Sequence, residues 1–499
     1  MTARLLHAEW TKFRTVRGWV IAMVTAALVT VLIAMWAGSA GQDQCGGAAG
    51  GPVTCQPDVP LGPGGEAVTD VFYFVRQPLP GNGSVTVRVT SLAGVVSSEQ
   101  LNGPVTAGLQ PWSKAGIMVK ASSRAGSAYA AIMVTGGHGV RMQDDYVDDT
   151  AGPPGSPGPV PAASRRWLRL VRSGDTVTGY ESADGTRWTR VGAVRLAGLP
   201  ATAQAGLFVT SPDQVNATGG APTEATAVFD HVSPPGPWSG GQIGANGTSY
   251  PALSGRFQQV GGRFTVTGSG DIAPALPGPA DGYVSPEHSL AGVFAALIVV
   301  TVVGTMFVTA EYRRGLMRVT LAASPGRGRV LAAKAIVIGS VTFAAGLAGA
   351  AAALPVGARL LRANGKFVLP VSALTEVRLI AGTAALLAVA AVLAVALGAI
   401  LRHGAGPVAA VIAVIVVPYF FASPLGVLPP GVADWLLRVT PAAGFAVEQA
   451  IARYAQVASS YTPRYDYYPL APWAGFAVLC AWTALALAVA LVVLHRRDA

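Results

Sequence analysis

Six stretches of the chain are apolar and free of charged side chains, and no other feature limits the possible folds as strongly. Most are long enough to cross a bilayer core of roughly 30 Å as a helix of about 20 residues. The fifth is the shortest and contains Pro418. Together they predict a helical protein with six membrane spans. They cover residues 18–36, 289–310, 335–358, 379–401, 407–422 and 472–494.

The positive charge of the chain lies beside these stretches. The net charge is +10, yet residues 41–286 hold slightly more acidic than basic side chains. Because short cytoplasmic loops are rich in Lys and Arg, the most basic loop, residues 311–334, is expected in the cytoplasm. Both termini of this multi-pass cell-membrane protein then lie in the cytoplasm, and residues 41–286 lie outside the cell. Charge in these positions faces a lipid bilayer, so nucleic acid is not an expected partner.

Residues 41–286 differ from the apolar stretches because they are rich in Gly, Pro, Ser and Thr and contain short alternating segments. In "SVTVRVTS", Val85, Val87 and Val89 would point to one face of a strand. This pattern predicts an extracellular all-β domain. It separates residues 1–40, an expected elbow helix and first span, from residues 287–499, which carry the other five spans.

Strand-like runs separated by turn residues fill one segment of this domain, "RWLRLVRSGDTVTGYESADGTRWTRVG" (166–192). Asp184-Gly185 predicts a two-residue hairpin turn, since both residues tolerate positive φ angles. Trp167, Tyr180 and Trp188 are expected to meet in the core or across neighbouring strands.

Four segments of the domain are arranged in a recognisable order. They are "PWSKAGIMVKAS" (111–122), "WLRLVRSGDTVTGYESADGTRWTRVG" (167–192), "AGLFVTS" (205–211) and "AVFDHVS" (227–233). Together they resemble concanavalin-like jelly-roll domains, with a core at about residues 66–233. The resemblance implies an all-β jelly-roll sandwich inserted into a six-span α-helical membrane domain. It also implies a glycan such as cell-wall glycan as a ligand, but no Glu-x-Asp-x-Glu run is present, so hydrolysis is not expected.

Few residues suggest other chemistry. Asp144, Asp145, Asp148 and Asp149 lie together in "QDDYVDDT" and either bind a cation such as calcium or form a solvated acidic loop, which their irregular spacing favours. The other prediction is a disulfide between Cys45 and Cys55 outside the membrane. The six His residues are scattered, so no metal site, catalytic residue or cofactor is expected.

The N-terminal segment ahead of the first span has helical periodicity. Leu6, Trp10, Phe13 and Arg17 recur on one side, whereas Lys12 and Arg14 lie on another. The pattern favours a helix in the inner membrane interface, with its polar face towards anionic headgroups. A basic cluster that only fixes the topology is the alternative.

The basic loop between the second and third spans, "EYRRGLMRVTLAASPGRGRVLAAK" (311–334), holds six Lys and Arg residues. Its pattern predicts a helix through "EYRRGLMRVTLAA" and a break at Ser324-Pro325-Gly326. The loop is either an anchor at the headgroups or a lever on which a cytoplasmic partner acts. No phosphate-binding loop of the G-x-x-x-x-G-K-[ST] type is present, so energy for uphill transport would come from another chain.

"HAEWTKFRTVRGWV" (7–20) and "TAEYRRGLMRVTLAASPGRGRVLAAKAI" (309–336) resemble the permease subunits of type-two ABC exporters of high-GC, actinobacterial type. The resemblance implies that the first segment is an elbow helix and the second a coupling segment on an ABC ATPase subunit. Leu316 stands where many members have Thr. The positions implied for coupling are Glu311, Arg313, Arg314, Gly315, Arg318, Pro325, Arg327 and Lys334.

The resulting hypothesis is one half of an exporter that pairs with a second permease half, identical or related, and with ATPase partners. The charge-free spans weakly favour a lipid-like or amphipathic cargo. A multi-span surface receptor, or a glycan-binding protein that uses the β domain, is the alternative. An enzyme is not expected, because no nucleophile with its base is apparent.

Overall fold

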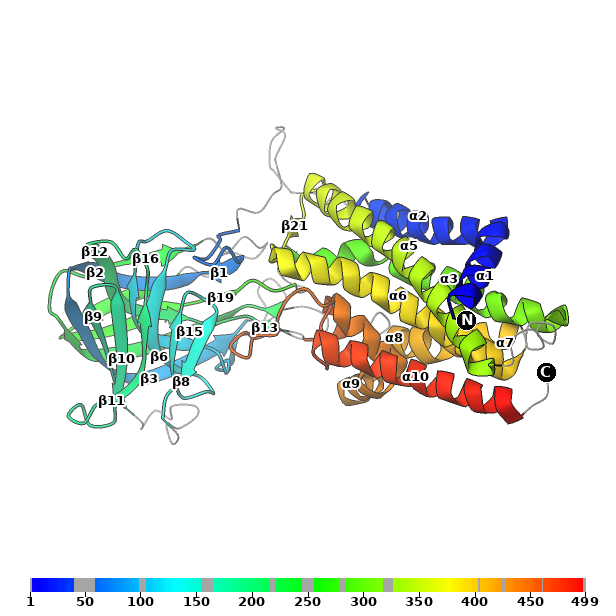
Figure 1. The fold of residues 1–499 in the computed structure, drawn as a ribbon. Coiled ribbons are helices and arrows are strands. Elements are labelled where there is room, and N and C mark those ends of the chain that lie inside the picture. Colours follow the sequence, from blue (N-terminus) through cyan, green and yellow to red (C-terminus); the bar gives the residue numbers. More distant parts are fainter. Residues whose placement is uncertain are drawn as a thin grey trace. The chain divides into compact units, whose positions relative to one another are not determined.

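The computed structural model comprises two compact units (Figure 1). The helical unit contains Met1–Gln56, Val284–Arg453 and Tyr461–Ala499. The β unit contains Pro57–Tyr283 and Tyr454–Ser460, so a short segment from near the C-terminus belongs to it. The structure describes residues 2–39, 59–97, 105–153, 165–215, 220–244, 255–277, 283–316, 326–402, 404–422, 428–459 and 461–496.

The helical unit has six helical segments long and apolar enough to span a membrane, as the sequence predicts. They are α2 (Arg17–Ser39), α3 (Val293–Arg313), α5 (Arg327–Ala363), α6 (Ala373–Leu401), the segment Ala405–Ala422, and α10 (Pro472–Arg496). The shorter described elements are α1 (Thr2–Thr15), η1 (Pro286–Leu290), β21 (Phe367–Val368), α9 (Pro430–Val439), η3 (Pro441–Glu448) and η4 (Pro463–Tyr465).

Small residues allow the central helices of this unit to approach closely. α5 packs against both α2 and α6. A Cβ added at Gly346 of α5 would lie 3.0 Å from the Cα of Ala384 in α6. A Cβ added at Gly304 of α3 would lie 2.6 Å from the carbonyl oxygen of Ala391 in α6. Such contacts replace the hydrophobic driving force that is missing between helices in lipid.

The fifth span is continuous but irregular. It consists of α7 (Ala405–Val411), the π-helical turn η2 (Ile412–Val416) and α8 (Val417–Ala422). Pro418 follows this turn, and proline has no N–H to donate. A π turn next to a proline redistributes the carbonyl acceptors, and it allows the short apolar stretch to remain helical.

Two antiparallel sheets form the β unit. The first has the order β11-β10-β9-β3-β15-β18-β17, with β4 paired to β3. Its strands are β3 (Gly83–Val96), β4 (Thr106–Ala107), β9 (Arg166–Ser173), β10 (Thr176–Ser182), β11 (Thr189–Arg195), β15 (Thr223–Ser233), β17 (Arg256–Val260) and β18 (Arg263–Gly268).

The second sheet has the order β16-β2-β12-β5-β6-β7-β8. Its strands are β2 (Phe72–Pro80), β5 (Lys114–Lys120), β6 (Tyr129–Thr135), β7 (Val140–Asp144), β8 (Asp148–Ala151), β12 (Thr202–Thr210) and β16 (Ser239–Ile243). The remaining short strands are β1 (Val68–Asp70), β13 (Gln214–Val215), β14 (Gly220–Ala221), β19 (Ile272–Pro274) and β20 (Tyr283–Val284).

The core lies between the two sheets, as the alternating pattern predicts. Val85, Val87 and Val89 are all buried there. β18 pairs with β15, so the strands after residue 233 complete the same sandwich. The opposite face of the second sheet is also buried, because Phe72, Met118 and their neighbours form a second apolar cluster there. Strands β5 and β6 are therefore buried on both faces.

The structure corrects two details of the segment 166–192. β10 ends at Ser182 and β11 begins at Thr189, so Asp184-Gly185 lies in a longer connection instead of a two-residue turn. The Asp184 carboxylate accepts N–H groups within this connection, which stabilises it without tight strand pairing. Trp167 and Trp188 lie outside the core. Their rings lie against the guanidinium groups of Arg88 and Arg169.

Candidate functional site

Four charged side chains from three helices meet beside the basic loop. Lys334 Nζ in α5 lies 2.9 Å from both carboxylate oxygens of Glu9 in α1. It also donates to Glu311 Oε1 at the end of α3, at 2.5 Å. Lys12 of α1 pairs with Glu311 and lies 3.8 Å from Glu9 Oε2. We call Glu9, Lys12, Glu311 and Lys334 the charge cluster.

Residue spacing on α1 and the ring of Phe307 hold the charge cluster in place. Glu9 and Lys12 are three residues apart on α1, so both face the same side. Phe307 lies one turn before Glu311 on α3, and its ring centroid is 5.5 Å from Lys12 Nζ and 5.0 Å from Lys334 Nζ. The ring face attracts both ammonium groups.

Because the cluster is largely buried, loss of any one of its charges would leave the others poorly compensated. Lys334 is fully buried, and Glu311 is 2% exposed. Buried charges cost desolvation energy, which their partners must offset. Lys12 is more exposed. Burial, followed by repulsion from Lys334, lowers the pKa of Lys12 to about 7, whereas Glu9 acts in the opposite direction.

The far flank of the loop is fixed to the last helix. Arg327, the first residue of α5, donates from its guanidinium to the carbonyl oxygens of Leu494 and His495 near the end of α10. These carbonyls belong to the last turn of α10, where a cation also complements the helix dipole. The two described flanks of the loop are therefore bound to α1 and α10.

Between the flanks, the described residues after α3 are exposed. Arg313 and Arg314 both face solvent. Gly315 has a φ of +68°, a conformation that ends the helix and that glycine adopts without steric cost. The helix predicted through "EYRRGLMRVTLAA" is therefore interrupted after Arg313, and Leu316, the last described residue of this part, is helical again. Arg318 and Pro325 lie outside the described residues.

The structure places the predicted elbow residues in different environments. Phe13 is buried and Leu6 half-buried, whereas Trp10 and Arg14 are exposed. Arg17 is the first residue of α2 and is not part of α1. Lys12 pairs with Glu311, so its ammonium group is not free on the polar face of α1.

Sequence reasoning missed Glu9, although a signal was present. It is the only acidic residue ahead of Asp43 in an otherwise basic leader. A lone carboxylate at the membrane interface indicates a specific basic partner, because it would otherwise be repelled by anionic headgroups. The sequence alone does not identify Lys334 as this partner, because the two residues are far apart along the chain.

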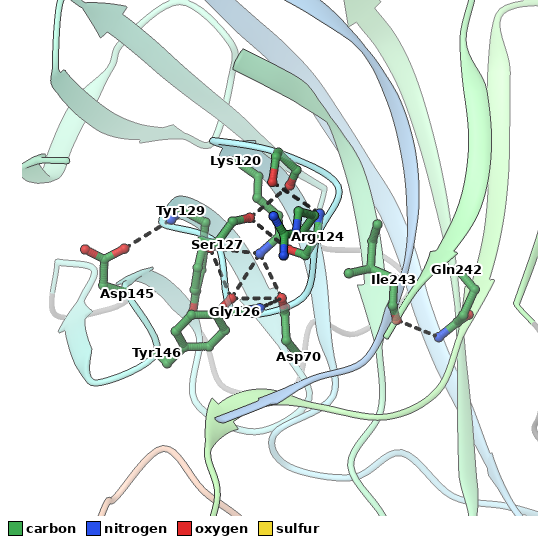
Figure 2. Close-up of polar contacts among 11 residues, drawn as sticks. Asp70, Lys120, Arg124, Gly126, Ser127, Tyr129, Asp145, Tyr146, Gln242 and Ile243 are labelled. Carbon is green, nitrogen blue, oxygen red and sulfur yellow. Dashed lines mark hydrogen bonds and ion pairs between the residues drawn. The ribbon is translucent and has the colours of Figure 1, made fainter. Parts of the chain in front are cut away.

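The β unit contains a buried polar network of its own (Figure 2). Lys120 Nζ donates to Asp70 Oδ2 at 2.8 Å and to the carbonyl oxygen of Ser127 at 2.9 Å. Tyr146 Oη and the backbone N–H of Gly126 donate to the same Asp70 oxygen. Burial lowers the pKa of Lys120, and the Asp70 charge opposes this. This network lies on the outer face of the second sheet.

The acidic run at residues 144–149 is partly held by protein donors. Asp144 and Asp148 oppose each other across β7 and β8. Arg141 pairs with the Asp149 carboxylate, and Asp145 Oδ1 accepts a backbone N–H. Burial, and then the Asp148 charge, raises the pKa of Asp144 to about 7. In the described ranges, no three His, Cys, Asp or Glu side chains are grouped as metal ligands. Cys45 and Cys55 lie outside these ranges.

The fold defines a multi-pass membrane protein with an inserted β-sandwich. A family model described as "ABC-2 family transporter protein" matches residues 170–499. The chain belongs to this ABC-2 family of transporters, whose permeases lack ATPase activity and pair with an ATPase subunit. No curated protein matches the chain.

Solved structures show only distant likeness. A GH43 protein from Bacillus licheniformis has 15% identity and a TM-score of 0.16, over 28% of this chain and 24% of its own. A functionally unknown protein from Saccharomyces cerevisiae has 16% identity and a TM-score of 0.19, over 34% and 74%. Scytalido-glutamic peptidase has 7% identity and a TM-score of 0.26, over 42% and 100%. The matched part is about a quarter of the length of the first of these proteins.

Proposed function

We propose that the chain is one permease half of an ABC exporter and that the basic loop couples it to a separate ATPase subunit. The charge cluster is the observation that carries this proposal. It joins α1, the end of α3 and the start of α5, so a push on the loop between them would reach three helices at once. Arg313 and Arg314 remain exposed beside it, available to acidic groups of a partner.

In this mechanism the loop acts as a lever with fixed flanks. ATP binding and hydrolysis in the partner displace the loop. Lys334 then transmits the displacement to α1 and α3, and Arg327 transmits it to α10. Two permease halves, identical or related, would enclose the path and alternate its access between the two sides of the membrane.

The proposed topology has both termini in the cytoplasm and residues 41–286 outside the cell. The basic loop then faces the cytoplasm, where an ATPase would be found. An amphipathic small molecule is the cargo that best suits the apolar spans. Proposed domain limits are 1–40, 41–286 and 287–499.

Exchange of Arg313, Arg314 and Arg318 for Ala tests the coupling role. We expect stimulation of the partner's ATPase activity in the reconstituted complex to fall by about tenfold, because charge-assisted hydrogen bonds at the docking surface are lost. Exchange of Arg190 and Arg195 for Ala, two exposed arginines of the β unit, is the control and should leave stimulation unchanged. Equal stimulation in all three proteins would defeat the assignment.

Glycan binding by the β unit is a second candidate function, supported by the exposed face of the first sheet. Arg169 stacks on Trp188 at 3.9 Å and Arg88 lies 5.5 Å from the Trp167 ring centroid. Arg88 is also held by both carboxylate oxygens of Asp230, at 2.7 Å each. Half-exposed rings beside ordered guanidinium groups suit a sugar polymer that carries acidic groups.

Exchange of Trp167 and Trp188 for Ala should therefore reduce retention of the full-length protein on purified cell-wall glycan by at least fivefold, because the stacking surface is removed. A pull-down assay measures this retention. Trp238→Ala, which removes a ring packed on Phe264, is the control and should keep retention. Undiminished retention after loss of both rings would remove this face from consideration.

A further inference from the structure

Three carboxyl groups gather at the end of the helical unit that is far from the charge cluster along α3. Glu287 belongs to η1 just ahead of α3, Glu448 is the last residue of η3, and Asp466 follows η4. Glu287 and Glu448 are each 7% exposed. All three lie outside the candidate spans. We call these three residues the outer acidic cluster.

Only uncharged donors satisfy these carboxyl groups among the described residues. The donors are Ser285 Oγ to Asp466 Oδ2 at 2.5 Å, Thr383 Oγ1 to Glu448 Oε1 at 2.9 Å, and Ala450 N to Glu287 Oε1 at 2.8 Å. The Ser285 hydroxyl and the backbone N–H of Glu287 also act on the Glu287 carboxyl group. Glu287 Oε2 is buried and has no hydrogen-bond partner in the described structure. A buried carboxylate oxygen without a donor is costly, so it indicates a missing proton or ligand.

The basic groups nearby do not neutralise the cluster. Arg378 donates to the carbonyl oxygen of Gln449 at 2.6 Å. Its guanidinium group also interacts electrostatically with the Glu287 carboxyl group. His288 is exposed and acts on Asp466. Neither forms an ion pair with a cluster carboxylate in the part of the chain that the structure describes. When ionised, the three carboxyl groups therefore carry negative charge that the two described basic groups around them do not neutralise.

Aromatic rings adjoin the acids. The ring centroids of Phe294, Tyr419 and Phe445 are 4.5 to 4.8 Å apart, and Tyr468 lies 6.5 Å from Tyr419. Tyr468 connects the rings to the acids, because it follows Asp466 by two residues and its backbone N–H donates to Oε1 of Gln449, the residue after Glu448, at 3.1 Å. Ring faces and carboxylates together attract a large, weakly hydrated cation.

We propose that the outer acidic cluster and the adjoining rings form a binding site for an organic cation, such as an apolar molecule with an ammonium or phosphonium group. The inference rests on the proposed transport function, in which this end of the helical unit lies on the path of the cargo. The cation supplies the positive charge that the cluster lacks, and the rings take its apolar part. An inorganic cation such as calcium would need six or more oxygen ligands, and in the described part of the chain the three carboxyl groups are not arranged closely enough to hold a metal ion together.

Binding should depend on pH because protons compete with the cation for the carboxylates. Burial raises the pKa of Glu448 to about 8 and raises those of Glu287 and Asp466, and the Asp466 charge adds to the effect on Glu287. With a pKa of about 8, the Glu448 carboxyl group is mostly neutral at pH 6 and becomes ionised as the pH rises above 8. An organic cation must displace these protons, so its affinity rises with pH over this interval.

The test measures tetraphenylphosphonium binding to the full-length protein in lipid nanodiscs by titration calorimetry. We expect binding at pH 8.5, proton release on binding near pH 7, and affinity at least tenfold lower at pH 6. Glu448→Gln should lower the affinity at pH 8.5 at least tenfold and flatten the pH dependence. The isosteric amide resembles the protonated acid, so folding should be preserved, which a thermal unfolding curve checks. Glu376→Gln, at an exposed carboxylate in the first turn of α6, is the control and should bind as the parent does.

Three results would overturn the site: no tetraphenylphosphonium binding at pH 8.5, equal affinity in Glu448→Gln, or displacement of the probe by calcium. Equal binding of the neutral triphenylphosphine oxide would show a merely apolar pocket and would also overturn it. Failure of this site can be distinguished from failure of the proposed transport function. If the probe binds but the protein does not stimulate the partner's ATPase activity, the cation site stands and the proposed transport mechanism is rejected. If the protein stimulates the ATPase but does not bind the probe, the mechanism stands and the cation site is rejected.

Discussion

Exchange of Lys334 for Met is expected to destabilise the helical unit by about 3–5 kcal/mol and to abolish coupling to the ATPase. The substitution keeps the length of the side chain but leaves Glu9 and Glu311 close together with only Lys12 to balance them. Removal of one partner from a buried ion pair leaves an uncompensated charge, and this accounts for the large effect. Thermal unfolding of the purified protein and ATPase stimulation in the reconstituted complex measure the two losses.

The double variant Lys334→Met with Glu311→Gln should recover much of the lost stability, because the remaining Glu9 and Lys12 are balanced in charge. Arg329→Met, which removes an exposed cation from the same helix, should behave as the parent does. Lys12→Met should have an intermediate effect, since Lys12 is more exposed than Lys334. A Lys334→Met protein with parental stability would show that the cluster does not hold these helices together.

The spans and the β-sandwich were predictable because both follow from short-range patterns. Each span is an uninterrupted apolar run, and a chain in lipid must satisfy its backbone groups locally. Val85, Val87 and Val89 alternate with polar residues, so they assign one face of β3 to the core. Neither inference requires knowledge of the distant partner.

The partners themselves could not be derived from the sequence. Lys334 was identified only as a position of the basic loop, because its carboxylate partner Glu9 is 325 residues away. The acids of the outer acidic cluster lie in loops beyond the apolar runs, where isolated carboxylates are normally solvated. Trp167 is expected from the sequence to meet other aromatic rings in the core or across strands, but its strand register places it on the face opposite Leu168, opposite Arg88 of β3.

Exchange of Lys120 for Met should unfold or strongly destabilise the β unit, with a loss of about 3–5 kcal/mol. Lys120 and Asp70 are both fully buried, so the substitution leaves the Asp70 carboxylate without a cation in an apolar layer (Figure 2). For a unit of this size the loss corresponds to a fall of roughly 10 °C in the melting temperature. Near-ultraviolet circular dichroism of the full-length protein during heating follows this unit through its aromatic residues.

The matched variants separate loss of charge pairing from loss of packing. Lys120→Met combined with Asp70→Asn removes both charges and should regain part of the melting temperature, because the amide can still accept from Tyr146 and Gly126. Arg124→Met, at an exposed position of the neighbouring loop, should leave it unchanged. If the double variant melted as low as Lys120→Met alone, packing of the lysine stem would stabilise this layer and the ion pair would not.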